Sequence, residues 1–214
     1  FGDEAMVRAR VAVEARYLIA LSEVGLIRKL NSNEKDTLLN LHQKLDSKSY
    51  KDLRKTEAEV RHDVMVMTMF MRKKLASSKL SDIIDAGWIH WGLTSEDVDN
   101  LARSTLLKAF ISDVYLPEAI TFLDNTVSLA EKTNSVVIPG KTHFQTAVPT
   151  TLGKEITLFG LRASEQLIKI KKLPLRGKLT GAVGNIAAQK AANPRINWRI
   201  FSKNFVESLG LEAN

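Results

Sequence analysis

Apolar residues recur at steps of three and four along most of the chain, which is the spacing that places them on one face of an α-helix. In the first 25 residues this stripe consists of Met6, Ala9, Val13, Tyr17, Ala20 and Val24. Gly25 follows the stripe, and glycine commonly ends a helix. The pattern therefore predicts an amphipathic helix at the start of the chain.

Two further helices are expected before residue 76. Asn33 is a capping residue with Asp36 three positions later, an arrangement typical of a helix start. The apolar face of this second helix is then made by Leu38, Leu41 and Leu45. A third, longer helix is predicted from about residue 56 to residue 75. Its stripe consists of Val60, Val64, Met67 and Met71.

The segment Thr94-Ser95-Glu96-Asp97 predicts the start of a long helix, after a short helix and a turn within residues 77–92. A hydroxyl group there accepts an orphan backbone N–H, and acidic residues suit the positive end of the helix dipole. The helix is expected to reach about Lys132. Because an interior proline costs about 3 kcal/mol, we expect a kink or a division at Pro117.

Turn signals interrupt the rest of the chain. Residues 134–149 are predicted to form a loop, with Pro139-Gly140 as its turn. Thr150 or Thr151 then caps another helix, which ends near Pro174. The following loop is marked by Gly177, Gly181 and Gly184, and a last helix is expected between Asn197 and Gly210.

No segment has the alternation typical of a β-strand, so the predicted fold is all-α. We expect a small N-terminal helical domain over residues 1–92 and the long helices of an elongated helical bundle over residues 93–214. The 214 residues include no cysteine, and 44% are hydrophobic. These proportions are those of a globular protein without a disulfide framework or a cysteine nucleophile, and they fit a reducing compartment.

Hydropathy and charge bear on the possible partners. The longest stretch without a charged residue, Thr142 to Gly153, is too short to cross a bilayer, which takes about 20 residues. The opening Phe1-Gly2-Asp3-Glu4 is not typical of a secretory signal, and its lack of Met predicts a fragment or a processed end. The net charge of +7 permits binding to nucleic acid or to phosphorylated small molecules, but the basic residues are spread along the chain.

Three of the four histidines have neighbours that bear on chemistry. His62 lies in Arg61-His62-Asp63, within the predicted third helix, and His90 lies shortly before Thr94-Ser95. His143 lies in the predicted loop before a capped helix. His42 lies among polar neighbours in a leucine-rich helix and is interpreted as an ordinary side chain.

Each of these segments has a physical reason to bind or react. Hydroxyl groups at a helix N-terminus, as at Thr94 and Ser95, suit a carboxylate or a phosphate. Arg61 can bind an anion through two hydrogen bonds, and Asp63 can orient an imidazole or a ribose hydroxyl. A histidine such as His143 can transfer a proton, which contributes about 10²–10⁴ in rate. Taken singly, each segment also fits a plain structural role.

Neither a phosphate loop nor a metal site is predicted. The glycines of residues 177–184 match neither G-x-x-x-x-G-K-[ST] nor a strand-led G-x-G-x-x-G. Tight turns or close helix contacts explain them better. The His, Asp and Glu residues show no metal-ligand spacing.

Together and in this order, the segments resemble the adenylosuccinate lyases. The resemblance rests on Arg61-His62-Asp63-Val64, His90-Trp91-Gly92-Leu93-Thr94-Ser95-Glu96-Asp97, Thr142-His143-Phe144-Gln145, Gly177-Lys178-Leu179-Thr180-Gly181-Ala182-Val183-Gly184-Asn185 and Pro194-Arg195-Ile196-Asn197-Trp198. It covers nearly the whole chain. It implies the helical fold of the fumarase and aspartase superfamily. It also implies elimination of fumarate from adenylosuccinate and from the succinylated aminoimidazole carboxamide ribotide of purine synthesis, without a metal or an organic cofactor.

The resemblance also implies roles for single residues. His143 would be the proton donor to the leaving nitrogen. Arg61, His62 and Asp63 would hold the nucleotide part of the substrate. The substrate would also be bound by Thr94 and Ser95, and His90 would shape the same pocket.

Two departures from the family pattern lead to expectations of their own. The family's Gly-Ser-Ser loop, whose serine acts as the base, has no match in these 214 residues. Phe144 and Thr146 stand where many relatives have Gly and Pro. We therefore expect a truncated bundle that does not turn over substrate alone, with altered details in the loop around His143.

The family further implies a cytoplasmic homotetramer in which the long helices of four subunits pack together, so the apolar stripes between Leu101 and Ala130 would face partner chains. It implies no contact with nucleic acid or membrane. Three alternatives remain open. They are another fumarate-releasing lyase, such as an argininosuccinate or aspartate lyase, a non-catalytic basic helical module that binds nucleic acid, and a structural fragment that only oligomerises.

Overall fold

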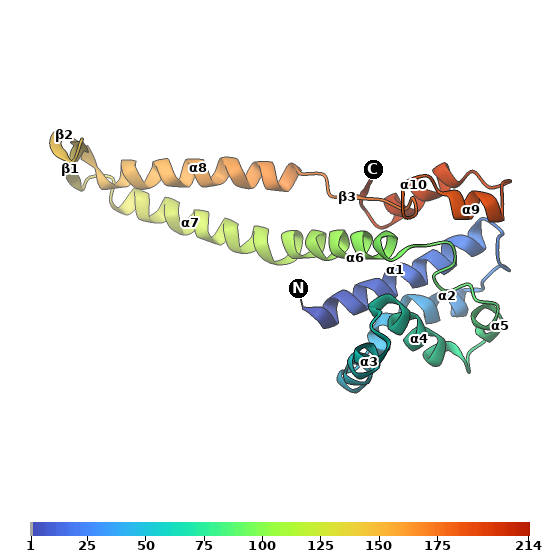
Figure 1. Ribbon diagram of the computed structural model, residues 1–214. Coiled ribbons are helices and arrows are strands. Elements are labelled where there is room, and N and C mark those ends of the chain that lie inside the picture. Colours follow the sequence, from blue (N-terminus) through green and yellow to red (C-terminus); the bar gives the residue numbers. More distant parts are fainter. Residues whose placement is uncertain (1) are drawn as a thin grey trace. The chain divides into compact units, whose positions relative to one another are not determined.

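A computed structural model describes residues 2–214 and is mainly helical, as predicted (Figure 1). The helices are α1 (Asp3–Glu23), α2 (Ser32–Leu39), the 3-10 helix η1 (Leu41–Lys44), α3 (Ser47–Val60), α4 (Asp63–Leu75), α5 (Ser81–Asp85), α6 (Ser95–Phe110), the π-helical η2 (Ile111–Tyr115), α7 (Leu116–Lys132), α8 (Leu152–Lys172), α9 (Ala187–Ala192) and α10 (Trp198–Ser208). The strands are β1 (Val137–Thr142), β2 (Gln145–Thr151), β3 (Arg176–Gly177) and β4 (Glu212–Ala213). The expectation that no strand would form is therefore wrong.

The chain divides into two compact units. The first runs up to Leu107 and includes Leu175–Asn214, and the second is Lys108–Pro174. The first unit is thus built from two separate stretches of sequence. The predicted domain boundary after residue 92 falls inside it.

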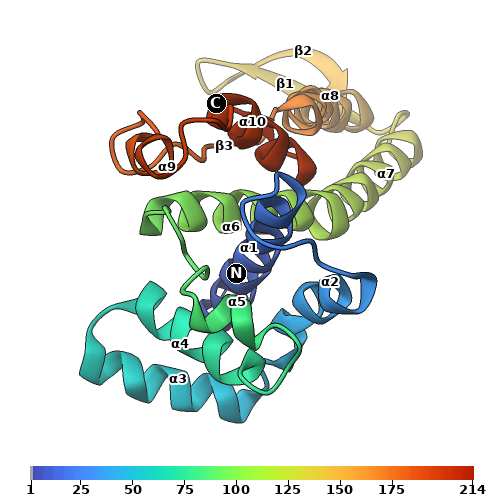
Figure 2. The same cartoon turned by 90° about the vertical axis from the view of Figure 1, so that its right-hand side faces the viewer.

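The first unit is organised around α1. Helices α2 to α5 lie on one side of α1, and α9 and α10 lie on the other (Figures 1 and 2). The apolar face of α1 supplies Val11, Tyr17, Leu18 and Leu21 to a continuous core, and all four are fully or almost fully buried. The predicted first helix is confirmed.

Helix α2 begins two residues earlier than predicted. Its cap is Asn31, whose side chain accepts the N–H of Glu34, while the Glu34 carboxylate accepts the N–H of Asn31. This reciprocal pair satisfies two orphan donors, which the predicted cap at Asn33 would not do. The predicted apolar face extends beyond α2, because the chain passes through η1 from Leu41.

The long third helix predicted for residues 56–75 is wrong, because two helices occupy this region. Helix α3 ends at Val60, and the next residue, Arg61, adopts a left-handed conformation with φ of 57°. Helix α4 then starts at Asp63 with His62 as its cap, because the His62 ring accepts the N–H of Met65. The stripe of apolar residues continues across this break, so its spacing alone did not indicate a corner.

The second unit is a pair of helices joined by a hairpin. Helices α7 and α8 run side by side, and β1 and β2 pair antiparallel between them (Figure 1). The predicted loop at 134–149 is therefore largely this hairpin. Helix α8 is capped by Thr151, whose hydroxyl accepts the N–H of Lys154.

The disturbance expected at Pro117 takes the form of a change in helix type. The backbone is π-helical over η2, and Pro117 then lies in the first turn of α7. A proline lacks the N–H that the regular helical ladder uses, and a π-helical turn within an α-helix is a recurrent form of such a disturbance. The helical backbone therefore continues past the proline.

Very little of the second unit is buried. Among residues 108–174, Ala130 and Gly153 are the two buried residues. Gly153 lies where α8 meets the end of α7, and a Cβ atom there would be 2.3 Å from the Ala130 carbonyl oxygen. Large apolar side chains that are more than half exposed include Ile120, Phe122, Val127, Leu129, Phe159, Leu161 and Ile168. This unit has no core of its own.

The C-terminal stretch Leu175–Asn214 completes the first unit. Strand β3 pairs parallel with β4, with Arg176 opposite Glu212. The predicted last helix is α10, and Asn197 caps it by accepting the N–H of Ile200. Across residues 2–214, no helix is both long and apolar enough to cross a membrane.

Candidate active site

The predicted hydroxyl segment lies at the start of α6. The Thr94 carbonyl accepts the N–H of Asp97, while the Thr94 N–H and hydroxyl both donate to Asp97 Oδ2, at 3.0 and 3.1 Å. Thr94 is thus held by the helix that it caps. Ser95 is half-buried, and its hydroxyl forms no hydrogen bond to any residue in 2–214. That hydroxyl is available to a ligand.

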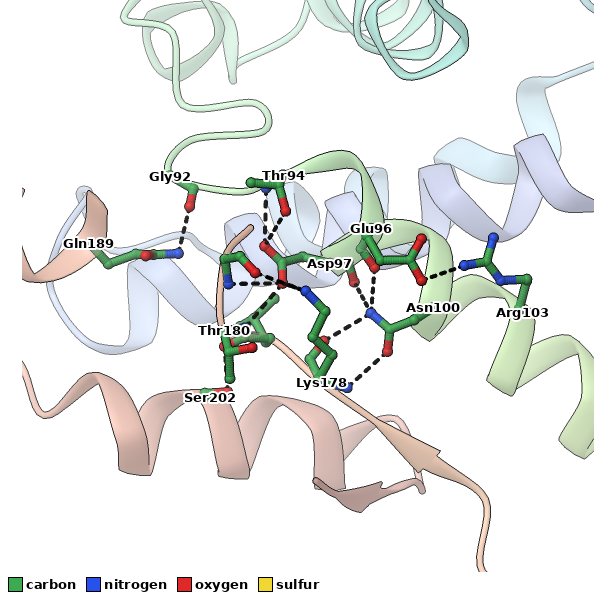
Figure 3. A network of polar contacts seen from close by, with 12 residues as sticks. Gly92, Thr94, Glu96, Asp97, Asn100, Arg103, Lys178, Thr180, Gln189 and Ser202 are labelled. Carbon is green, nitrogen blue, oxygen red and sulfur yellow. Dashed lines mark hydrogen bonds and ion pairs between the residues drawn. The ribbon is translucent and has the colours of Figure 1, made fainter. Parts of the chain in front are cut away.

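The carboxylate of Asp97 also binds the glycine-containing loop that follows β3 (Figure 3). Its Oδ1 accepts from the ammonium group of Lys178 at 3.1 Å and from the N–H groups of Thr180 and Gly181 at 3.0 and 3.1 Å. Asp97 is completely buried. A buried carboxylate is stable only when it is paired and hydrogen-bonded, and these five donors meet that condition.

His90 lies just before this segment and is held by α1. The Glu14 carboxylate accepts the His90 backbone N–H at 3.1 Å and contacts ring Nδ1 at 2.5 Å. Glu14 is fully buried and the His90 side chain is 23% exposed. Burial disfavours the charged ring, but the hydrogen bond and negative charge of Glu14 outweigh it, so the pKa of His90 is raised. The ring therefore carries a proton on Nδ1 and leaves Nε2 for other contacts.

The second predicted segment lies at the corner between α3 and α4. Arg61 and His62 are exposed there, and the Arg61 guanidinium forms no ion pair within the described part of the chain. Asp63 pairs with Arg10 of α1 at 2.6 Å. Burial opposes the charge of Asp63, but Arg10 and the N–H of Val64 favour it, so the pKa of this carboxyl is lowered. Asp63 is therefore an anion near neutral pH.

Arg10 connects this corner to the hydroxyl segment. Its guanidinium also binds Asp99 of α6 at 2.6 Å. Asp99 lies one helical turn beyond Ser95. The structure thus brings Arg61, His62 and Asp63 to the same unit as Thr94 and Ser95, with one arginine between the two segments.

His143 lies in the other unit, at the tip of the hairpin. It forms the two-residue turn together with Phe144, and both residues have left-handed backbones, with φ of 48° and 63°. The His143 side chain is exposed, and its ring is not bonded to any part of the chain that the structure describes. The structure therefore joins five of the six predicted site residues in one unit and places the proposed acid in the second.

Four charged residues of the site were not predicted to belong to it. Arg10, Glu14, Asp97 and Lys178 position the predicted residues. A signal existed for Asp97, because an acidic residue three positions after a threonine has the spacing of a capping box. The sequence signal for Glu14 was weaker, because it consists only of an acidic residue between the apolar residues Val13 and Ala15.

The described residues contain no group of three or more His, Asp or Glu side chains placed to hold a metal ion. The first unit offers the Ser95 hydroxyl, the unpaired Arg61 guanidinium, the exposed His62 imidazole and the partly exposed Asp63 carboxylate, and the second unit offers the exposed His143 imidazole. Such a set can bind anions and hydroxyl groups and can move a proton.

A family model described as lyase matches residues 2–213. The chain is 34% identical to the adenylosuccinate lyase of Buchnera aphidicola subsp. Schizaphis graminum, over 100% of this chain and 47% of that protein. It is 31% identical to the adenylosuccinate lyase of Escherichia coli K12, with the same coverage, and 29% identical to that of Dictyostelium discoideum, over 98% of this chain and 46% of that protein. The chain thus spans about half the length of the curated relatives it matches.

The fold is also found among solved structures. β-Carboxy-cis,cis-muconate cycloisomerase from Acinetobacter calcoaceticus matches with a TM-score of 0.82 and 20% identity, over 100% of this chain and 48% of that one. A fumarate lyase from Mesorhizobium matches with a TM-score of 0.77 and 15% identity, over 99% and 47%. At these identities the likeness concerns the fold alone. The family match over residues 2–213 goes further, and the chain belongs to the lyase family within the fumarase and aspartase superfamily.

Proposed function

We propose that this chain is part of an adenylosuccinate lyase. The reaction is elimination of fumarate from adenylosuccinate, which gives AMP, and from the succinylated aminoimidazole carboxamide ribotide of the same pathway. The observation that carries the proposal is the chain-long similarity to adenylosuccinate lyases of bacteria and of Dictyostelium, at 29–34% identity. The reaction needs no redox change, and we propose that it proceeds without a cofactor.

His143 is the proposed acid. As the C–N bond breaks, the leaving nitrogen needs a proton, and an imidazole within hydrogen-bonding distance supplies one at neutral pH. The exposure of His143 at a hairpin tip supports this role, because no residue in 2–214 occupies its ring nitrogens. The base that takes the carbon proton is proposed to be the serine of the family's Gly-Ser-Ser loop, which these residues do not include.

The other predicted residues bind the substrate in this proposal. The unpaired guanidinium of Arg61 suits a phosphate, and His62 lies beside it. Asp63 is held as an anion by Arg10 and can accept a hydrogen bond from a ribose hydroxyl. Thr94 and Ser95 bind the substrate at the N-terminus of α6, where the Ser95 hydroxyl, the helix dipole and free N–H groups suit a carboxylate.

We further propose a cytoplasmic homotetramer whose subunits pack through α7 and α8. The support is the near absence of burial in residues 108–174 and the row of exposed apolar side chains on these helices. Exposed apolar surface on this scale marks an interface. In such an assembly, His143 of one subunit can complete the site formed by Arg61 and Ser95 of another.

The test is fumarate release from adenylosuccinate by the full-length protein. His143→Ala should lower kcat by about a hundredfold or more, because a general acid contributes about 10²–10⁴. His42→Ala is the control, since His42 is half-buried and its ring contacts the Leu39 carbonyl oxygen of its own segment. Release only from argininosuccinate or aspartate would replace the proposed substrate, and undiminished release by His143→Ala would remove His143 from its role.

A further inference from the structure

The loop that follows β3, residues 178–184, is fixed to α6 by side chains of a single helical turn. Asp97 Oδ1 accepts from Lys178, Thr180 and Gly181. Asn100 makes two bonds with the backbone of Lys178, accepting its N–H at 2.8 Å and donating to its carbonyl at 3.0 Å. The loop therefore cannot shift without breaking contacts to the helix that begins with Thr94 and Ser95.

Further contacts hold the same loop from its own side. The Lys178 ammonium donates to the Gly181 carbonyl at 2.9 Å, which closes the loop on itself. Ser202 of α10 donates to the Leu179 carbonyl at 2.6 Å (Figure 3). Beyond Gly181 the loop becomes exposed, and the Val183 side chain is 80% accessible. The base of the loop is thus rigid, while its tip faces outward.

The two oxygens of Asp97 have separate tasks. Oδ2 binds only Thr94, and Oδ1 binds only the loop. Since the Thr94 hydroxyl donates its hydrogen to Oδ2, it faces a ligand as an acceptor. The Ser95 hydroxyl has no such bond within residues 2–214 and remains able to donate.

We propose that Asp97, with Lys178, is the positioning residue that makes the loop 178–184 a second wall of the substrate site. The buried Asp97 carboxylate takes the hydrogen of the Thr94 hydroxyl, so Thr94 can only accept a hydrogen bond from the substrate. Ser95 remains the donor to a substrate carboxylate. The same carboxylate fixes the loop 178–184 beside both hydroxyl groups. This inference rests on the proposed function. Asp97 itself touches no substrate, because it is fully buried and its oxygens are occupied.

A buried ion pair is a costly way to join a loop to a helix. Well-packed apolar residues of similar size would hold the two elements as firmly or more firmly. The charged pair differs from apolar packing in that its hydrogen bonds fix the orientation of the Thr94 hydroxyl and of the N–H groups of Thr180 and Gly181. That property is useful where the geometry of a ligand site must be set.

The test uses Asp97→Asn and Lys178→Met in the full-length protein. An asparagine has one acceptor oxygen, so its amide N–H2 must face either the Thr94 N–H or the loop N–H groups. We expect KM for adenylosuccinate to rise about tenfold or more, with a smaller change in kcat, because a charged hydrogen bond is lost from the binding geometry. Amide hydrogen exchange over residues 178–184 should become at least tenfold faster.

Glu96→Gln is the matched control. Glu96 is the neighbour of Asp97, but it is exposed and pairs with Arg103 across the helix surface. This substitution should leave KM and loop exchange unchanged.

A lowered Tm with unchanged KM in the variants would overturn the proposal and leave Asp97 a purely structural residue. If Asp97→Asn does not fold, Lys178→Met decides, since Lys178 is 25% exposed and tolerates an apolar replacement better. Absence of fumarate release from the wild type would refute the proposed function instead. Loop exchange in the same variants would then still decide whether the Asp97–Lys178 contact fixes the loop, and unchanged exchange would overturn it.

Discussion

At the scale of single residues, the backbone around the proposed acid is unusual. His143 and Phe144 form a two-residue turn in which both have positive φ. Such turns favour Asn-Gly, because residues with a Cβ atom pay about 1–2 kcal/mol in the left-handed region. The Phe144 ring recovers none of this cost through burial, since it is 97% exposed. The hairpin therefore carries local strain next to His143.

Replacing Phe144 by glycine should relieve part of this strain. We expect Phe144→Gly to stabilise the hairpin by about 1 kcal/mol and to slow amide exchange in residues 137–151 about fivefold. Phe144→Ala is the control, because it removes the ring but keeps the Cβ atom at positive φ. Equal slowing in both variants would locate the effect in the ring rather than in the backbone.

The contact between His90 and Glu14 predicts a pH dependence of stability. The pKa of His90 is raised in the folded protein above the ordinary value of about 6.5. The contact therefore contributes its full stability below the unfolded pKa and loses the charged part as pH rises through the folded pKa. The groups that face the ring with negative charge are Glu14, Asp97 and Asp99.

As pH rises above about 6.5, we expect the free energy of unfolding of the wild type to fall relative to that of His90→Gln, as measured by urea denaturation at each pH. His42→Gln should keep the dependence of the wild type. A parallel fall in His90→Gln would assign the pH dependence to other groups.

The sequence identified the residues with free functional groups better than the residues that position them. Arg61, Ser95 and His143 were singled out from local motifs, and each presents an unbonded group in the described structure. The His90 partner of Glu14 and the loop partners of Asp97 lie more than 70 positions away in the chain. Spacing along one sequence carries no information about such contacts.

At the scale of elements, the corner between α3 and α4 depends on Arg10. Its guanidinium is 11% exposed and bridges Asp63 and Asp99, and the Asp99 side chain is 15% exposed. Removing the cation would leave two carboxylates in partly buried positions without their partner. This bridge therefore holds the start of α4 and the body of α6 against α1.

Arg10→Met should lower the free energy of unfolding by about 2 kcal/mol, because it removes the partly buried charged hydrogen bonds to Asp63 and to Asp99. Equilibrium unfolding in guanidinium chloride measures this loss in the free energy of unfolding. Arg54→Met is the matched control, because Arg54 is half-exposed and pairs at the surface with Glu57. It should cost about 0.5 kcal/mol or less. Similar losses in both variants would contradict the bridging role.

The contact between α7 and α8 depends on Gly153. A Cβ atom at this position would lie 2.3 Å from the Ala130 carbonyl oxygen and 2.7 Å from Asn134 Cα. Since backbone atoms cannot move aside as a side chain can, Gly153→Ala should cost about 3 kcal/mol.

Circular dichroism melting measures the effect of Gly153→Ala. Gly160→Ala on the same helix is the control, because its nearest neighbour is the Thr126 methyl group at 3.2 Å. We expect that substitution to be neutral or slightly stabilising, since alanine favours the helix. An unchanged melting curve for Gly153→Ala would show that the two helices separate easily.

Helical elements were predicted well where apolar spacing and caps agreed, as for α1, α8 and α10. The hairpin was missed because its strands contain Pro139, Gly140 and Pro149 and do not alternate apolar with polar residues. The corner at Arg61 was missed because a left-handed residue other than glycine or asparagine has no signature in sequence.

At the scale of the whole molecule, burial is distributed very unevenly. Every member of the hydrophobic core cluster lies outside residues 108–174. A helical hairpin with so little buried surface is not stable in water by itself. We therefore expect the full-length protein to associate through these helices.

Sedimentation velocity tests this expectation. The double variant Phe122→Glu/Phe159→Glu should shift the protein toward smaller species, because it places charges in the apolar surface of α7 and α8. Lys55→Glu, an exposed change in the other unit, should leave the distribution unaltered. A wild type that sediments as a monomer would exclude the homotetramer.

The pairing of β3 with β4 has a consequence for synthesis on the ribosome. The first unit needs residues 175–213, yet its other half, up to Leu107, emerges much earlier. During that interval the early helices lack α10, and the Tyr17 ring lacks its edge contacts with Phe201 and Phe205. The nascent chain therefore exposes part of its apolar core surface while the ribosome translates the inserted helical hairpin, residues 108–174. At this stage of synthesis the chain is most prone to aggregate and most in need of a chaperone.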